Sequence, residues 1–155
     1  MLQQATFEFL RQLKENNNRD WFIANKKQYD TAKEDFIQLV TAVIAELAKY
    51  DPTVKDLDAK KCLFRINRDV RFSKDKSPYK INFSAVFGKD GKHTDGACYY
   101  LHLQPEGCFA AGGYWMPSPE HLKAIRQEID YNAVAFKKIV TAKEFVDTYG
   151  KLSEE

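Results

Sequence analysis

The order in which hydrophobic periodicity changes along the 155 residues constrains the fold most strongly. Apolar residues recur every three or four positions up to about Lys49, alternate with polar residues in the middle, and return to helical spacing after Pro117. The first and last patterns are typical of amphipathic helices, and alternation is typical of half-buried strands. Because helices and strands are segregated, the sequence predicts an α+β fold. It has an antiparallel sheet of about four or more strands, packed by N-terminal and C-terminal helices.

Capping and turn residues predict where these elements begin and end. Thr6 is expected to cap the first helix, Asp20 the second, and Ser118 a later one with Pro119 at its first position. Asn16 and the two asparagines after it are expected to end the first helix in a left-handed conformation. The expected helices cover residues 7–15, a short stretch from 21, 27–49, a stretch from 119 to about 129, 132–140 and 142–149. The expected strands cover residues 63–67, 81–87, 97–104 and 108–114, with a hairpin turn at 89–92.

Length and cysteine content indicate the class of protein. A chain of 155 residues has the usual size of one domain, and we expect a single α+β domain over residues 1–155. Its three cysteines lack metal-binding spacing, as do its three histidines, which favours a reducing compartment and no metal site. No apolar run is long enough to cross a bilayer, and the first residues do not resemble a secretory signal. We therefore expect a cytoplasmic protein without membrane contact.

The stretch from Lys60 to Lys80 carries the distinctive chemistry. It holds eight basic and two acidic residues, whereas the rest of the chain holds 16 basic and 20 acidic ones. Within it, Arg65, Arg68 and Arg71 recur every third residue. Arginine is well shaped for bidentate contact with a carboxylate or phosphate. The segment 64–80 therefore predicts an anion site.

Arg68 is expected to share a strand face with apolar residues, so its charge needs a partner. Asp69 and Asp75 are the nearest carboxylates in the sequence and are candidates for structural ion pairs. The residues expected to bind a ligand are Arg65, Arg68, Arg71, Lys76, Tyr79, Lys80 and His102. Tyr99, Tyr100, Tyr114 and Trp115 are expected to form an aromatic wall beside this basic segment.

The central string FRINRDVRFSKDKSPYK resembles the signature of an uncharacterised microbial family, domain of unknown function 2461. Further similarity runs from Phe9 to Ile129, which is nearly the whole chain. The resemblance implies no activity, cofactor or catalytic residue, because the family has none assigned. Family members extend some tens of residues beyond the position of Glu155. The resemblance therefore implies that a C-terminal part is lacking or shortened.

Three functions are compatible with the basic segment. The first is binding of a small phosphorylated or carboxylated molecule, with or without turnover, and it predicts arginines converging on a pocket. The second is a non-enzymatic module for nucleic acid or an acidic protein, with an open basic stripe; the net charge of +2 makes nucleic acid less favoured.

The third is a purely structural network in which each arginine pairs with an internal carboxylate. In that case Arg68→Ala is expected to cost about 3 kcal/mol if the pair is buried. Cofactor and oligomeric state do not follow from the sequence.

Overall fold

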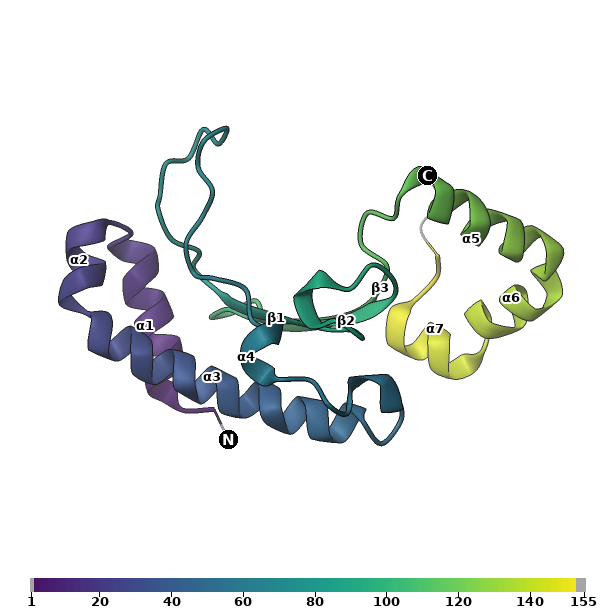
Figure 1. Ribbon diagram of the computed structural model, residues 1–155, viewed down its shortest axis with the longest axis horizontal. Coiled ribbons are helices and arrows are strands. Elements are labelled where there is room, and N and C mark those ends of the chain that lie inside the picture. Colours follow the sequence, from purple (N-terminus) through teal and green to yellow (C-terminus); the bar gives the residue numbers. More distant parts are fainter. Residues whose placement is uncertain (1, 153–155) are drawn as a thin grey trace. The chain divides into compact units, whose positions relative to one another are not determined.

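Two groups of elements make up the computed structural model, which describes residues 2–152 (Figure 1). Met1–Trp115 contains the N-terminal helices and the sheet, and Met116–Glu155 contains three further helices. Each of the two units is compact, and the single domain expected from the sequence stays a prediction.

Three helices open the first unit: α1 Gln4–Glu15, α2 Arg19–Ala24 and α3 Lys26–Leu47. The apolar stripes predicted on the first and third are confirmed, since Phe9, Leu10 and Leu13 of α1 are buried, as are the corresponding residues of α3. A single helical turn, Pro52–Val54, and the short helix α4, Ala59–Cys62, lead into the sheet. The structure is therefore helical where the apolar residues follow a helical period.

Two predicted caps are wrong, and the first helix ends where predicted but in a different backbone conformation. Thr6 lies inside α1, and its hydroxyl donates to the buried carboxylate of Asp35 in α3. The side chain of Asn18, and not that of Asp20, accepts from the Trp21 N–H and caps α2. Asn16 ends α1 with φ of −122°, outside the left-handed region. Each sequence pattern was sound locally, but tertiary partners such as Asp35 decided which side chains were used.

The sheet has three antiparallel strands within residues 2–152, in the order β1 Phe83–Phe87, β2 Cys98–Leu103 and β3 Phe109–Gly113. A fourth strand predicted at residues 63–67 is reduced to isolated bridges, Leu63 with Ala85 and Asn67 with Tyr79. Local side-chain to backbone bonds replace the ladder beyond this point, because Asp69 accepts from Arg71 N–H and Asp75 from Ser77 N–H. The expectation of four or more strands is thus not met.

The link between β1 and β2 is longer than the hairpin turn predicted at residues 89–92. Gly91, at a φ of +60°, opens a short helical turn, Gly91–His93. The hydroxyl of Thr94 accepts from the Asp90 N–H and donates to the Gly91 carbonyl. These bonds close a compact connection from residue 88 to residue 97.

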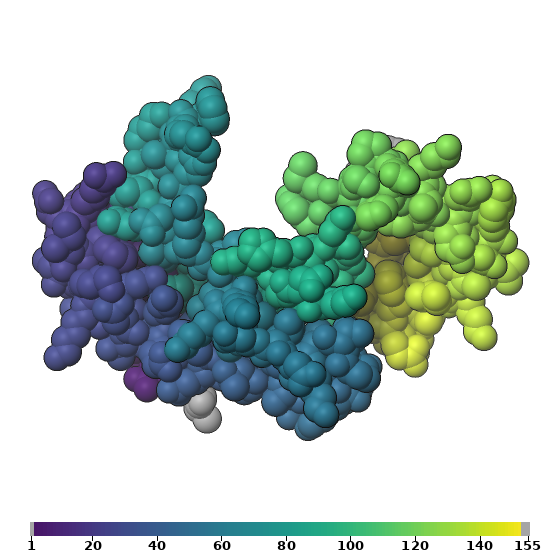
Figure 2. All heavy atoms as spheres, viewed as in Figure 1, coloured from purple at the N-terminus to yellow at the C-terminus, as the bar shows by residue number. Residues whose placement is uncertain are grey.

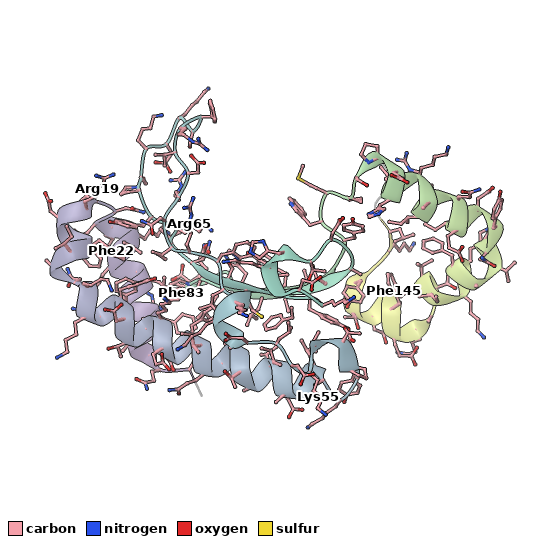
Figure 3. All side chains as sticks on the ribbon, viewed as in Figure 1. Arg19, Phe22, Lys55, Arg65, Phe83 and Phe145 are labelled. Atoms are coloured by element: carbon pink, nitrogen blue, oxygen red, sulfur yellow. The ribbon has the colours of Figure 1, made fainter. Side chains whose placement is uncertain are left out.

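The two faces of the sheet differ in character. On the inner face, Phe83 packs between the rings of Phe9 and Phe36, with centroids 6.4 and 5.5 Å away (Figure 3). Because side chains alternate along a strand, Ser84 and Val86 point to the opposite face, as do their partners on β2, His102 and Tyr100. We call this the outer face.

The second unit is described by α5 Pro119–Tyr131, α6 Ala133–Val140 and α7 Lys143–Tyr149. The predicted cap is confirmed, because the Ser118 hydroxyl oxygen accepts from the His121 N–H at 3.2 Å. None of the residues described in these three helices is buried. Across residues 2–152, no helix combines the length and the apolar character that crossing a membrane requires.

Candidate anion-binding site

The basic segment forms a long hairpin that leaves the sheet beside β1 (Figure 1). Its two arms are joined by the Phe64 N–H to the Ser84 carbonyl at 3.0 Å, and by the Lys80 N–H to the Ile66 carbonyl at 2.8 Å. We call residues 63–67 and 78–85 the base, and residues 68–77 the tip. Figure 2 shows the tip standing clear of the helices and strands of Met1–Trp115. The base therefore lies against the sheet, whereas the tip is surrounded largely by solvent.

The arginines near the tip are neutralised by carboxylates of the tip itself. Arg68 is ion-paired with Asp75 and also donates to the Ser77 carbonyl at 3.2 Å. Arg71 binds Asp69 through two nitrogens, at 3.0 Å from Nε and 2.7 Å from Nη2. The Lys76 amine donates to the Val70 carbonyl at 3.0 Å. These cations hold the loop together, as the structural hypothesis expects of them.

Hydrogen bonds keep both tip carboxylates ionised. The hydroxyl and N–H of Ser77, and then Arg68, lower the pKa of Asp75. Arg71 lowers the pKa of Asp69 in the same way. A carboxyl group held ionised is a poor proton donor at neutral pH. Asp69 and Asp75 therefore lie in the tip as ion-pair partners.

Tyr79 anchors the base of the hairpin in the core. Its side chain is only 7% exposed, and its ring stacks on Phe22 with centroids 4.0 Å apart (Figure 3). The Asn17 amide donates to the Tyr79 carbonyl at 2.9 Å and accepts from the Tyr79 N–H at 3.1 Å. This position makes Tyr79 a core residue, and it gives no support to the predicted role in ligand binding.

The base holds two cations without a carboxylate partner among the described residues, Arg65 and Lys80. The amine of Lys80 lies 5.1 Å from the centroid of the Phe64 ring. Burial, and then the nearby charge of Arg65, lower the pKa of Lys80. Figure 3 places Arg65 at the base, where the hairpin leaves the sheet. Positive charge is thus concentrated there without internal compensation.

Lys80 lines a cavity of about 750 Å³ over the outer face of the sheet. Small residues of β3, Ala111 to Gly113, leave room above the strand, and aromatic rings form much of the wall. The lining residues are Phe64, Lys80, Asn82, Ser84, Val86, Cys98, Tyr100, Phe109, Ala111, Gly112, Gly113, Tyr114 and Trp115. Its size and apolar lining fit a small organic molecule.

Three of the four rings predicted to form an aromatic wall line this cavity: Tyr100, Tyr114 and Trp115. Tyr99 takes the opposite face of β2, where its hydroxyl donates to Asp51 at 3.3 Å. Alternation along the strand explains the split, because neighbouring residues point to opposite faces.

A chain of hydrogen bonds runs from the cavity wall to its rim. The Tyr100 hydroxyl bonds to His102 Nδ1 at 2.9 Å, and His102 Nε2 bonds to the Gln104 side chain at 3.2 Å. The His102 ring stacks on Phe109, with centroids 4.7 Å apart. His102 does not line the cavity itself and reaches it only through Tyr100.

Two further features limit the chemistry of the cavity. Burial raises the pKa of the Cys98 thiol, which donates to the Gly113 carbonyl, so this thiol is a weak nucleophile. Within residues 2–152, histidine, cysteine and acidic side chains form no group of three or more that could hold a metal ion.

The structure brings only part of the predicted ligand set together. Lys80 lines the cavity and Arg65 lies close enough to Lys80 to act on its charge, whereas Arg68, Arg71 and Lys76 are bound within the hairpin. Sequence reasoning missed the cavity residues Asn82, Ser84, Phe109 and Ala111. The alternating pattern from residue 82 to 86 was the available signal for Asn82 and Ser84, since it assigns both to one face. The sequence did not show that this face is open.

Comparison with known proteins agrees with the resemblance of the central string. The sequence profile of a family described as a conserved hypothetical protein, DUF2461, matches residues 5–155. The chain belongs to this family. No curated protein and no solved structure matches it. Membership in DUF2461 therefore identifies the chain without assigning an activity.

Proposed function

We propose that this DUF2461 protein binds a small molecule with an anionic group and a flat apolar body in the cavity on the outer face. The observation that carries the proposal is the Lys80 amine, which lines an apolar cavity and has no carboxylate partner among residues 2–152. A carboxylate or phosphate would lie beside Lys80 and Arg65. The apolar body would lie among the rings of Phe64, Tyr100 and Trp115.

The energetics of a partly desolvated cation support this choice. A charge removed from water is costly unless a counter-charge or hydrogen-bond acceptor replaces the lost hydration. The neighbouring charge of Arg65 adds to that cost, as the lowered pKa of Lys80 indicates. A ligand anion would compensate both cations, and aromatic walls favour planar ligands through stacking.

A nucleic-acid module is less well supported by the same hairpin. An open basic stripe needs several free cations, but Arg68 and Arg71 are already paired with carboxylates. A small ligand uses the two cations that remain uncompensated.

A thermal-shift titration tests the proposal. The panel is 3-phenylpropanoate, phenyl phosphate, inorganic phosphate and a short oligonucleotide, each at low and high salt. We expect one of the two aromatic anions to stabilise the fold by about 2.7 kcal/mol at a hundred times its dissociation constant. Stabilisation should survive high salt and be lost in Lys80→Met.

The matched control is Arg71→Ala, which removes a cation of the tip and should leave the titration unchanged. If only the oligonucleotide stabilises the protein, and only at low salt, the nucleic-acid alternative replaces the proposal. A flat response to every compound contradicts a ligand site in this cavity.

A further inference from the structure

The surroundings of the Lys80 amine are those of a reactive amine as well as those of an anion anchor. The residue is half-buried on the wall of the cavity, and the charge of Arg65 acts on its amine. Burial and a like charge both favour the neutral form, and they lower the pKa of Lys80. A neutral amine is a nucleophile, whereas an ammonium group is not.

A second lysine in the same protein lacks these surroundings. The amine of Lys26 lies 5.1 Å from the centroid of Tyr29, the same distance that separates Lys80 from Phe64. Lys26, however, is ion-paired with Asp30, and its side chain is largely exposed. The two lysines share an aromatic contact and differ in counter-charge and burial, so they form a matched pair.

The cavity also supplies groups that suit addition of an amine to a carbonyl. Asn82 and Ser84 line the same wall as Lys80 and offer hydrogen bonds to a carbonyl oxygen. The Tyr100 hydroxyl lines the cavity and is bonded through His102 to Gln104. Such a chain can pass a proton to the oxygen that must leave as water.

We propose that Lys80 condenses reversibly with the ketone of a small 2-oxo acid that has an apolar body. In this step the Lys80 nitrogen forms a C=N bond to the ketone carbon, and the C=O bond breaks. The oxygen leaves as water with the two protons of the amine. Arg65 pairs with the adjacent carboxylate. The proposal rests on the anion binding proposed above and names the chemical class of the ligand.

Reductive trapping tests this inference on the full chain. Phenylpyruvate is the probe, since it has a carboxylate, an adjacent ketone and a planar ring. Sodium cyanoborohydride reduces the imine to a stable secondary amine, which adds the mass of the probe less one oxygen atom. Peptide mapping by mass spectrometry then locates the adduct. We expect it on Lys80, and not on Lys26, at limiting probe concentration.

Two variants and one competitor make the test decisive. Lys80→Arg keeps the positive charge and should lose the adduct, and Lys80→Met should lose it as well. An excess of 3-phenylpropanoate, which lacks the ketone, should slow adduct formation at Lys80. Equal labelling of Lys26 and Lys80, or labelling of Lys80 that 3-phenylpropanoate does not slow, would overturn the inference.

Failure of this inference can be told apart from failure of the proposed function. If 3-phenylpropanoate stabilises the protein in a Lys80-dependent manner but phenylpyruvate leaves no adduct, anion binding stands and imine formation is wrong. If phenylpyruvate leaves no adduct and neither 3-phenylpropanoate nor phenyl phosphate stabilises the protein in a Lys80-dependent manner, both proposals are wrong.

Discussion

The base and the tip of the hairpin share one basic stretch of sequence but use their cations in opposite ways. At the tip, Arg71 lies two residues from Asp69, and Asp75 turns back to reach Arg68, so each arginine is neutralised. At the base, Arg65 and Lys80 form no ion pair among the described residues, and Lys80 borders an apolar cavity. The net positive charge of a segment therefore does not indicate which of its cations are available to a ligand.

The largest expected effect comes from the anchor of the base. Tyr79→Ala removes a ring that is 7% exposed and stacked on Phe22, so we expect a loss of about 3–5 kcal/mol in the free energy of unfolding. Phe72→Ala at the tip is the control, because this side chain is 95% exposed and should change stability by less than about 0.5 kcal/mol. Urea unfolding of both variants measures the difference. Equal losses would remove the contrast between base and tip.

A smaller loss in the free energy of unfolding is expected when the hydrogen bonds between the base and Asn17 are removed. Asn17→Ala removes two hydrogen bonds to the backbone of Tyr79 and leaves a buried N–H and carbonyl without them. Unsatisfied buried groups cost about 1–3 kcal/mol, and urea unfolding should detect that loss. Asn16→Ala is the control, because its amide donates only to the Gln12 carbonyl of its own helix. If Asn17→Ala leaves the free energy of unfolding unchanged, Tyr79 is held in place by packing alone.

The ion pair of the tip is expected to contribute less than a buried pair. The side chains of Arg68 and Asp75 are 26% and 61% exposed, so water screens their attraction. We expect Arg68→Ala to lower the free energy of unfolding by about 1 kcal/mol, measured by urea unfolding. This is less than the about 3 kcal/mol that the sequence suggested for a buried pair. High salt should shrink the difference between parent and variant. A cost near that of Tyr79→Ala would mean that the tip is as tightly built as the base.

The smallest effect concerns pH. The folded state lowers the pKa of Lys80, so between that value and the unfolded pKa of about 10.4 the unfolded chain binds more protons. Stability contributed by Lys80 therefore rises as pH increases through this window. Tyr114 and Cys98 of the cavity, whose pKa values are raised, also titrate at alkaline pH, so the informative quantity is the difference between the parent and Lys80→Met. We expect a flatter alkaline slope in Lys80→Met, measured by urea unfolding at several pH values. Identical slopes would indicate that Lys80 is hydrated like any surface lysine.

Much of the fold follows from local patterns. The helical stripe of α3, the cap at Ser118 and the alternation of β2 are properties of short segments, and all three were predicted from the sequence. The fourth strand, predicted at residues 63–67, does not form, because Asp69 and Asp75 bond to nearby backbone in competition with the strand ladder. The sequence also identified the basic segment and its link to an aromatic wall.

The sequence by itself determined the order of elements, the inner and outer faces of the strands and the position of the charged hairpin. Tertiary structure alone decided which cations remain uncompensated and that the outer face bears a cavity. The physical reason is the distance along the sequence over which each interaction acts. Periodicity and capping act over a few residues, whereas Asn17 meets Tyr79 across 62 positions and Lys80 shares its cavity with Tyr100 and Trp115. Such contacts depend on how the hairpin and the sheet pack, and no local pattern encodes them.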